Sequence, residues 1–241
     1  MNFSPKTIPT RDRLIFAMDV PGAAPARELA EQLGESVTFY KLGLELFMSG
    51  GYFELLDWMV SHGKKVFVDL KFFDVPATVA AAVSQLRNRG VALTTVHGNQ
   101  AIMEAAAQAK GDVKILAVTV LTSLDRGDLD DLGFACDIEK LVLSRARRAL
   151  EAGCDGVVSS GLEAPLLRQF IDQRLLVVTP GIRPVENKPV DDQKRTVDVA
   201  QAFANGADYI VVGRPIKQAA DPRAAAEEIQ NTIAGVFDRR N

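Results

Sequence analysis

Short runs of apolar and β-branched residues recur along the whole chain, separated by longer segments with helical patterns. Most of these runs are continuously apolar rather than alternating, which is typical of parallel strands that are buried on both faces. Their starts lie between 19 and 42 residues apart, which is the spacing of strand–helix units. The eight runs are Leu14–Asp19, Thr38–Gly43, Lys65–Leu70, Ala92–Gly98, Lys114–Leu121, Gly156–Ser160, Leu175–Gly181 and Tyr209–Gly213.

Six segments between these runs have helical patterns and end directly before a glycine, a residue that tolerates the left-handed conformation just past a helix. These segments are Ala23–Leu33, Tyr52–His62, Pro76–Arg89, Asn99–Lys110, Ile138–Ala152 and Val197–Asn205. Asp137 is the N-cap candidate of the segment Ile138–Ala152, and Asp221, followed by a proline at N1, indicates one further helix start. Eight strand–helix units predict a single (β/α)8 barrel, an α/β fold, over residues 1–241 with its core at about 14–237. The alternative, a doubly wound open sheet, usually has fewer strands and gives no reason for eight units.

Composition narrows the class of protein without naming a function. The 28 basic and 31 acidic residues give a net charge of −3, which argues against nucleic-acid binding. Two cysteines and two histidines are too few for a disulfide framework or a histidine-rich metal site. The N-terminal segment lacks the pattern of a signal peptide and no apolar run is long enough to span a membrane. We therefore expect a cytoplasmic protein with no membrane partner.

The predicted strands end in polar side chains, and in a (β/α)8 barrel the strand C-termini form the active-site mouth. We expect Ser159, Ser160 and Asn99 among them to be merely solvated. The densest group is Asp69-Leu70-Lys71-Phe72-Phe73-Asp74, to which Lys41 is added from the neighbouring strand. In an extended strand Asp69 and Lys71 point to the same side, while Leu70 and Phe72 pack outward.

These four charges are either a structural ion-pair network or an active site. Burying charges costs several kcal/mol per ion before pairing recovers it, so stability is a weak reason to build such a group, and we favour the active site. The flanking carboxylates are expected to hold Lys71 as an ammonium. Such a group donates a proton, whereas Schiff-base chemistry needs a desolvated amine or one beside another cation.

Two arginine motifs follow the seventh and eighth predicted strands, where these barrels often bind phosphate. They are Thr179-Pro180-Gly181-Ile182-Arg183 and Gly213-Arg214-Pro215. The glycines permit a phosphate to approach the backbone closely, and the arginines offer forked hydrogen-bond donors that match phosphate oxygens. Either motif alone could also be a surface arginine beside a turn. Thr122–Cys136 and Ile182–Thr196 are long enough to be functional loops. The acidic run Asp125–Asp131 lacks the ligand spacing of a calcium loop, so we expect a solvated loop.

Taken together, these motifs resemble the orotidine 5′-phosphate decarboxylase family. The resemblance extends over nearly the whole chain and rests on Asp69-x-Lys71-x-x-Asp74-x-Pro76-x-Thr78, Asp19, Lys41, Leu121-Thr122-Ser123, both arginine motifs and Asp192-Gln193. It implies decarboxylation of orotidine 5′-phosphate to UMP, the last step of UMP synthesis, with no metal or organic cofactor.

The resemblance also implies a role for each site residue. Lys71 would protonate C6 of the pyrimidine, Asp69 would face the substrate carboxylate, and Lys41 would complete the charge network and contact ribose. Asp19 would bind a ribose hydroxyl and Thr122 the pyrimidine. The phosphate would be held by Arg183, Gln193, Gly213 and Arg214. Asp74 and Thr78 would reach the active site of a second copy, which implies an obligate homodimer with shared sites.

Two other functions stay open from the sequence. One is a sister barrel enzyme that uses magnesium, such as a keto-gulonate phosphate decarboxylase or a hexulose phosphate synthase, because the Asp-x-Lys-x-x-Asp core is shared with those enzymes. The other is a catalytically silent nucleotide-binding barrel. Loss of activity in EDTA would indicate the first, and a failure to form UMP would indicate the second.

Overall fold

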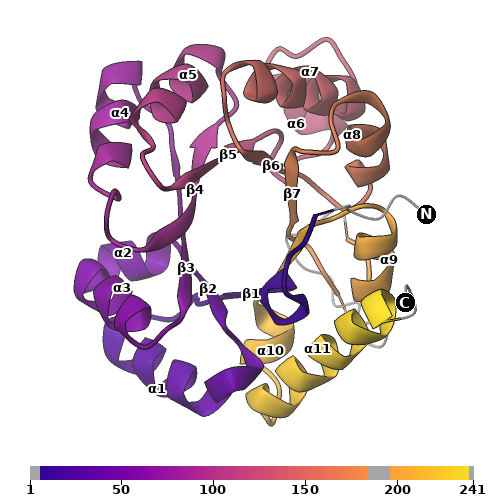
Figure 1. Ribbon diagram of the computed structural model, residues 1–241. Coiled ribbons are helices and arrows are strands. Elements are labelled where there is room, and N and C mark those ends of the chain that lie inside the picture. The colour runs from indigo at the N-terminus through magenta and orange to yellow at the C-terminus, as the bar shows by residue number, and fades with distance from the viewer. Residues whose placement is uncertain (1–5, 184–195, 239–241) are drawn as a thin grey trace.

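Eight parallel strands close into a barrel in chain order, β1 to β8, and helices surround them (Figure 1). The computed structural model describes residues 6–183 and 196–238. The strands are β1 (Leu14–Ala17), β2 (Phe39–Leu42), β3 (Lys65–Phe72), β4 (Val91–His97), β5 (Lys114–Val118), β6 (Gly156–Val158), β7 (Leu176–Thr179) and β8 (Tyr209–Val212). The predicted (β/α)8 barrel is confirmed.

The described helices cover the outer face of the barrel. They are α1 (Ala23–Leu33), α2 (Leu44–Ser49), α3 (Tyr52–Ser61), α4 (Pro76–Ser84), α5 (Gln100–Ala109), α6 (Arg126–Asp131), α7 (Ile138–Glu151), α8 (Ala164–Phe170), α9 (Val199–Ala204), α10 (Arg214–Lys217) and α11 (Pro222–Asp238), with 3-10 helices at Thr10–Arg13 and Gly34–Ser36. The six predicted helix-ending glycines all have positive φ, between 54° and 109°. Asp221 caps α11, since its carboxylate accepts from the Ala224 amide at 3.0 Å. Asp137 occupies the N-cap position of α7 without a side-chain cap bond.

Apolar side chains fill both sides of the sheet. The inward-facing side chains form one buried cluster inside the barrel, while two larger clusters lie between the sheet and the helices. The interior cluster consists of Ile15, Ala17, Phe39, Phe67, Leu93, Leu116, Leu176, Val178, Tyr209 and Val211. Because these side chains plug the barrel, we expect a ligand to bind at its C-terminal end rather than inside it.

One loop expected from the sequence is a helix instead. The acidic run was expected to be a solvated loop, but Arg126–Asp131 forms α6. The Asp125 carboxylate accepts from the Asp128 amide and the Asp128 carboxylate accepts from the Asp125 amide, which makes a capping box. This reciprocal capping stabilises a helix too short to show apolar periodicity.

Within residues 6–183 and 196–238, no helix is long and apolar enough to cross a lipid bilayer.

Candidate active site

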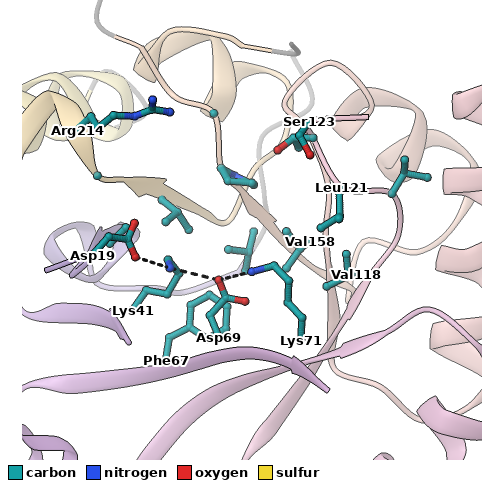
Figure 2. A pocket seen from close by; sticks show the side chains of 18 of the residues that line it. Asp19, Lys41, Phe67, Asp69, Lys71, Val118, Leu121, Ser123, Val158 and Arg214 are labelled. Atoms are coloured by element: carbon teal, nitrogen blue, oxygen red, sulfur yellow. Dashed lines mark hydrogen bonds and ion pairs between the residues drawn. The ribbon is translucent and has the colours of Figure 1, made fainter. Parts of the chain in front are cut away.

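A cavity of about 240 Å³ opens at the C-terminal ends of the strands. Its walls include eight of the residues expected to bind substrate or act on it, and Figure 2 shows most of them. These eight are Asp19, Lys41, Asp69, Lys71, Thr122, Arg183, Gly213 and Arg214. The expectation that the strand ends meet at one mouth is therefore confirmed for these residues.

Four charged side chains of alternating sign form a row along one side of this cavity (Figure 2). Lys41 Nζ lies 3.3 Å from Asp19 Oδ1 and 3.3 Å from Asp69 Oδ2. Lys71 Nζ lies 2.9 Å from the same Asp69 oxygen. Asp69 thus holds two ammonium groups through one oxygen, and Lys71 forms the end of the row.

Burial differs along the row and sets its electrostatics. The Asp69 side chain is 9 % exposed and Lys41 12 %, while Lys71 is 32 % exposed and faces the cavity. Burial by itself would raise the pKa of Asp69, but Lys41 and Lys71, with hydrogen bonds from Lys71 and Thr95, lower it below its usual value. Burial would likewise lower the pKa of Lys41, but the carboxylates of Asp69 and Asp19 raise it. Both groups are therefore ionised near neutral pH.

The backbone that presents Asp69 and Lys71 is not the plain extended strand expected from the sequence. Lys71 has φ = 48°, in the left-handed region that non-glycine residues rarely occupy. The pairing of β3 with β4 also shifts between Val68 and Phe72. The predicted side-chain directions are nevertheless confirmed. Asp69 and Lys71 both line the cavity, while Leu70 and Phe72 pack against the outer clusters.

The predicted phosphate-binding residues lie on the loops after β7 and β8. Arg214 begins α10, and Figure 2 shows its guanidinium across the cavity mouth from the Asp69–Lys71 pair. A Cβ on Gly213 would lie 3.3 Å from the Ala17 Cβ, so this position has little room for a larger residue. Gln193 lies outside the described residues.

Asp74 and Thr78 do not join this cavity. Both side chains are exposed, on the turn after β3 and at the start of α4, and neither lines the cavity wall in the described part of the chain. Their own chain therefore gives them no contact with the space where substrate would bind.

The sequence did not single out two groups of residues around the site. The first is an apolar wall beside Lys71, formed by Val118, Val158, Val178 and Val211. The second is Thr95, which is fully buried behind the charged row and bonds to both Asp69 and Lys71. Strand alternation could have found most of them, since Thr95, Val118, Val178 and Val211 each lie two positions beyond a residue of the interior cluster.

Two serines at the end of β6 were expected to be solvated, and this expectation is wrong. Ser159 and Ser160 are 1 % and 0 % exposed. Ser159 Oγ donates to Glu163 Oε2 at 3.2 Å, and Ser160 Oγ accepts from the Leu162 amide at 3.0 Å. Their hydroxyls are satisfied by the β6–α8 connection, so they are structural residues.

In the part of the chain that the structure describes, no three His, Cys, Asp or Glu residues are grouped so that they could hold a metal ion.

Comparison with known proteins agrees with this geometry. The model of the orotidine 5′-phosphate decarboxylase / HUMPS family matches residues 12–229. An orotidine 5′-phosphate decarboxylase from Methylococcus capsulatus is 68 % identical over 97 % of each chain, and one from Stenotrophomonas maltophilia is 52 % identical over 97 % of this chain and 98 % of its own. The crystal structure of the Lactobacillus acidophilus enzyme of the same name superposes with a TM-score of 0.81 at 33 % identity, covering 92 % of this chain and 99 % of that one. The chain belongs to the orotidine 5′-phosphate decarboxylase / HUMPS family.

Proposed function

We propose that this chain converts orotidine 5′-phosphate to UMP and carbon dioxide, with the Lys71 ammonium as the proton donor. The reaction is a decarboxylation in pyrimidine biosynthesis. One observation carries the assignment of the donor: Lys71 Nζ is the cationic end of the charged row, held 2.9 Å from Asp69 Oδ2 at the cavity wall. Relatives at 52–68 % identity with the same named activity favour this substrate over those of sister barrel enzymes.

The chemical step follows from the charges. The bond between C6 and the carboxylate breaks, carbon dioxide leaves, and the electron pair stays on C6. A Lys71 N–H proton then forms the new C6–H bond, and the neutral amine takes a proton back from solvent. The fixed Lys71 cation stabilises the carbanion as it develops, because a charge already in place requires no reorganisation during the reaction. Asp69 lies beside the position of the departing carboxylate and keeps the Lys71 ammonium oriented through their ion pair.

The remaining cavity residues bind the rest of the nucleotide. Asp19 accepts a hydrogen bond from a ribose hydroxyl, and Lys41 donates one to ribose. Thr122 contacts the pyrimidine on the opposite wall of the cavity. The phosphate is held at the mouth by Arg183, Gln193, Gly213 and Arg214. Binding energy from this remote phosphate positions C6 against Lys71.

A second copy of the chain completes the site. Exposed apolar side chains flank Asp74 on its turn, namely Phe73 and Val75, and others lie on α2, namely Leu44, Phe47 and Met48. Exposed apolar groups of this kind favour a surface that a partner covers. In a twofold dimer that buries this face, Asp74 and Thr78 of each chain enter the partner's cavity. There they contact the end of the charged row that is formed by the partner's Lys71. This arrangement gives both side chains a role that their own chain does not offer.

The activity itself is tested by the loss of orotidine 5′-phosphate absorbance with purified protein. We expect turnover with UMP as product, undiminished by EDTA. A protein that forms no UMP, or that loses all activity in EDTA, would contradict the assignment. In the same assay Lys71→Ala should lower kcat by about 10⁴-fold or more, because both the proton donor and the fixed charge are lost.

Mixing two inactive variants tests the shared site. Lys71→Ala and Asp74→Ala chains are unfolded together, refolded, and compared with each variant refolded alone. Random pairing makes half of the dimers mixed, each with one intact site, so activity should return to about a quarter of the wild-type value. A mixture that stays inactive although mass spectrometry shows mixed dimers would refute the role of Asp74 across the interface.

A further inference from the structure

Thr95 lies behind the charged row and forms hydrogen bonds with both Asp69 and Lys71, the two residues proposed to act at the reacting carbon. It belongs to β4, is fully buried, and does not line the cavity. Its Oγ1 accepts a hydrogen bond from the Lys71 backbone amide at 3.0 Å. The same hydroxyl donates to Asp69 Oδ1 at 2.9 Å. One side chain therefore touches the backbone of the proton donor and the carboxylate beside it.

The first bond holds an irregular stretch of strand. In the β3–β4 ladder Val68 pairs with Thr94 and Phe72 pairs with Val96, so three residues of β3 lie opposite Thr95 alone. Such a bulge re-aims side chains, and here it includes Lys71 in the left-handed region with φ = 48°. The Thr95 hydroxyl takes the amide hydrogen of that residue in place of a regular ladder carbonyl. It thereby fixes the direction in which the Lys71 side chain leaves the strand.

The second bond fixes the rotation of the Asp69 carboxylate. Oδ1 is occupied by Thr95, so Oδ2 is the oxygen turned toward Lys71 at 2.9 Å and Lys41 at 3.3 Å. A hydroxyl is suited to this position because it donates and accepts at once. An apolar side chain of the same shape would leave both the Lys71 amide and Asp69 Oδ1 without these partners.

We propose that Thr95 is a positioning residue for decarboxylation, which aims the Lys71 ammonium and the Asp69 carboxylate through a single hydroxyl. This inference rests on the proposed role of Lys71 as proton donor. Thr95 acts without contacting substrate, so its removal lowers kcat and leaves substrate binding nearly unchanged.

A matched pair of variants tests this. Thr95→Val removes the hydroxyl with little change of shape. Thr94→Val is the control, because Thr94 is equally buried on the same strand and its hydroxyl donates to the Val68 carbonyl at 2.9 Å. Urea unfolding and steady-state kinetics with orotidine 5′-phosphate are measured for both. We expect both variants to lose stability, Thr95→Val more because it loses two hydrogen bonds. A fall in kcat of about 10²-fold is expected for Thr95→Val alone, with KM changed less than about threefold.

The conservative variant completes the test. Thr95→Ser keeps the hydroxyl and should restore kcat to within about threefold of wild type. A Thr95→Val protein with the kcat of the Thr94→Val control, or a folded Thr95→Ser protein as slow as Thr95→Val, would overturn the inference. If Thr95→Val does not fold, Thr95→Cys replaces it; its weakly bonding thiol should give an intermediate kcat, and a wild-type kcat there would also overturn the inference.

Lys71→Ala, assayed alongside, separates this inference from the proposed function. A Lys71→Ala protein that retains turnover contradicts the assignment of the proton donor itself. An inactive Lys71→Ala protein together with a fully active Thr95→Val protein contradicts only the role of Thr95.

Discussion

Replacing Arg168 with methionine removes one half of a buried ion pair at the end of the barrel opposite the active site. The guanidinium on α8 donates to Asp208 Oδ2 at 2.8 Å, and the two side chains are 1 % and 0 % exposed. It also donates to the carbonyl oxygen of Gly206 at 2.7 and 2.8 Å and to that of Leu175 at 2.7 Å. Leu175 and Asp208 directly precede β7 and β8, so this arginine ties together the N-terminal ends of two strands.

The size of the effect follows from what the substitution leaves behind. Breaking a buried ion pair by removing one partner costs about 3–5 kcal/mol, because the remaining charge stays buried. Lys6 Nζ still lies 3.0 Å from Asp208 Oδ2 and offsets part of this loss, so we expect about 3–4 kcal/mol. For a domain of this size each kcal/mol lowers Tm by about 2–4 °C, which gives a decrease of roughly 6–16 °C.

Urea unfolding of Arg168→Met measures this loss as a lower midpoint with an unchanged m-value. Arg174→Met is the matched control, since Arg174 is 84 % exposed and pairs with Asp172 on the same α8–β7 connection. An exposed pair of this kind is screened by solvent and contributes little to stability. The folded Arg168→Met enzyme should keep its kcat/KM below the transition. A loss no larger than that of the control would refute the view that the buried ion pair holds the strand ends together.

Three further predictions concern other parts of the molecule. Gly235→Ala should stabilise the protein by up to about 1 kcal/mol in urea unfolding, because Gly235 lies within α11 and, among the described residues, no atom outside its own stretch of helix stands within 4 Å of the added methyl. A destabilised variant would contradict the packing of this helix. Iodoacetamide at about pH 8 should label one thiol per chain, because burial raises the pKa of Cys154 to about 12 while Cys136 is partly exposed. A Cys136→Ser chain that is still labelled would show that Cys154 is reactive. Arg214→Ala should raise KM for orotidine 5′-phosphate by about 10²-fold with a smaller change in kcat, because a forked contact to the phosphate is lost. An unchanged KM would show that Arg214 does not bind the phosphate.

Most of the fold could be read from the sequence because its signals are local. A continuous apolar run marks a strand buried on both faces, and a glycine after a helical pattern marks the helix end, wherever in space the two lie. Eight such units predict the barrel, and the barrel in turn predicts that Lys41, Asp69 and Lys71 meet at one end. Where these signals were weak the prediction failed, as for α6, which is too short for periodicity and depends on the reciprocal caps of Asp125 and Asp128.

The sequence alone therefore determined which charged residues gather at the barrel mouth, since strand order and side-chain alternation place them there. Only the tertiary structure decided how they are aimed. The left-handed Lys71 and the bulge opposite Thr95 depend on the register between β3 and β4, which is set by contacts between residues 24 or more positions apart. A hydrogen-bond partner across a sheet is fixed by packing of the whole barrel, so no local pattern in the chain could have named it.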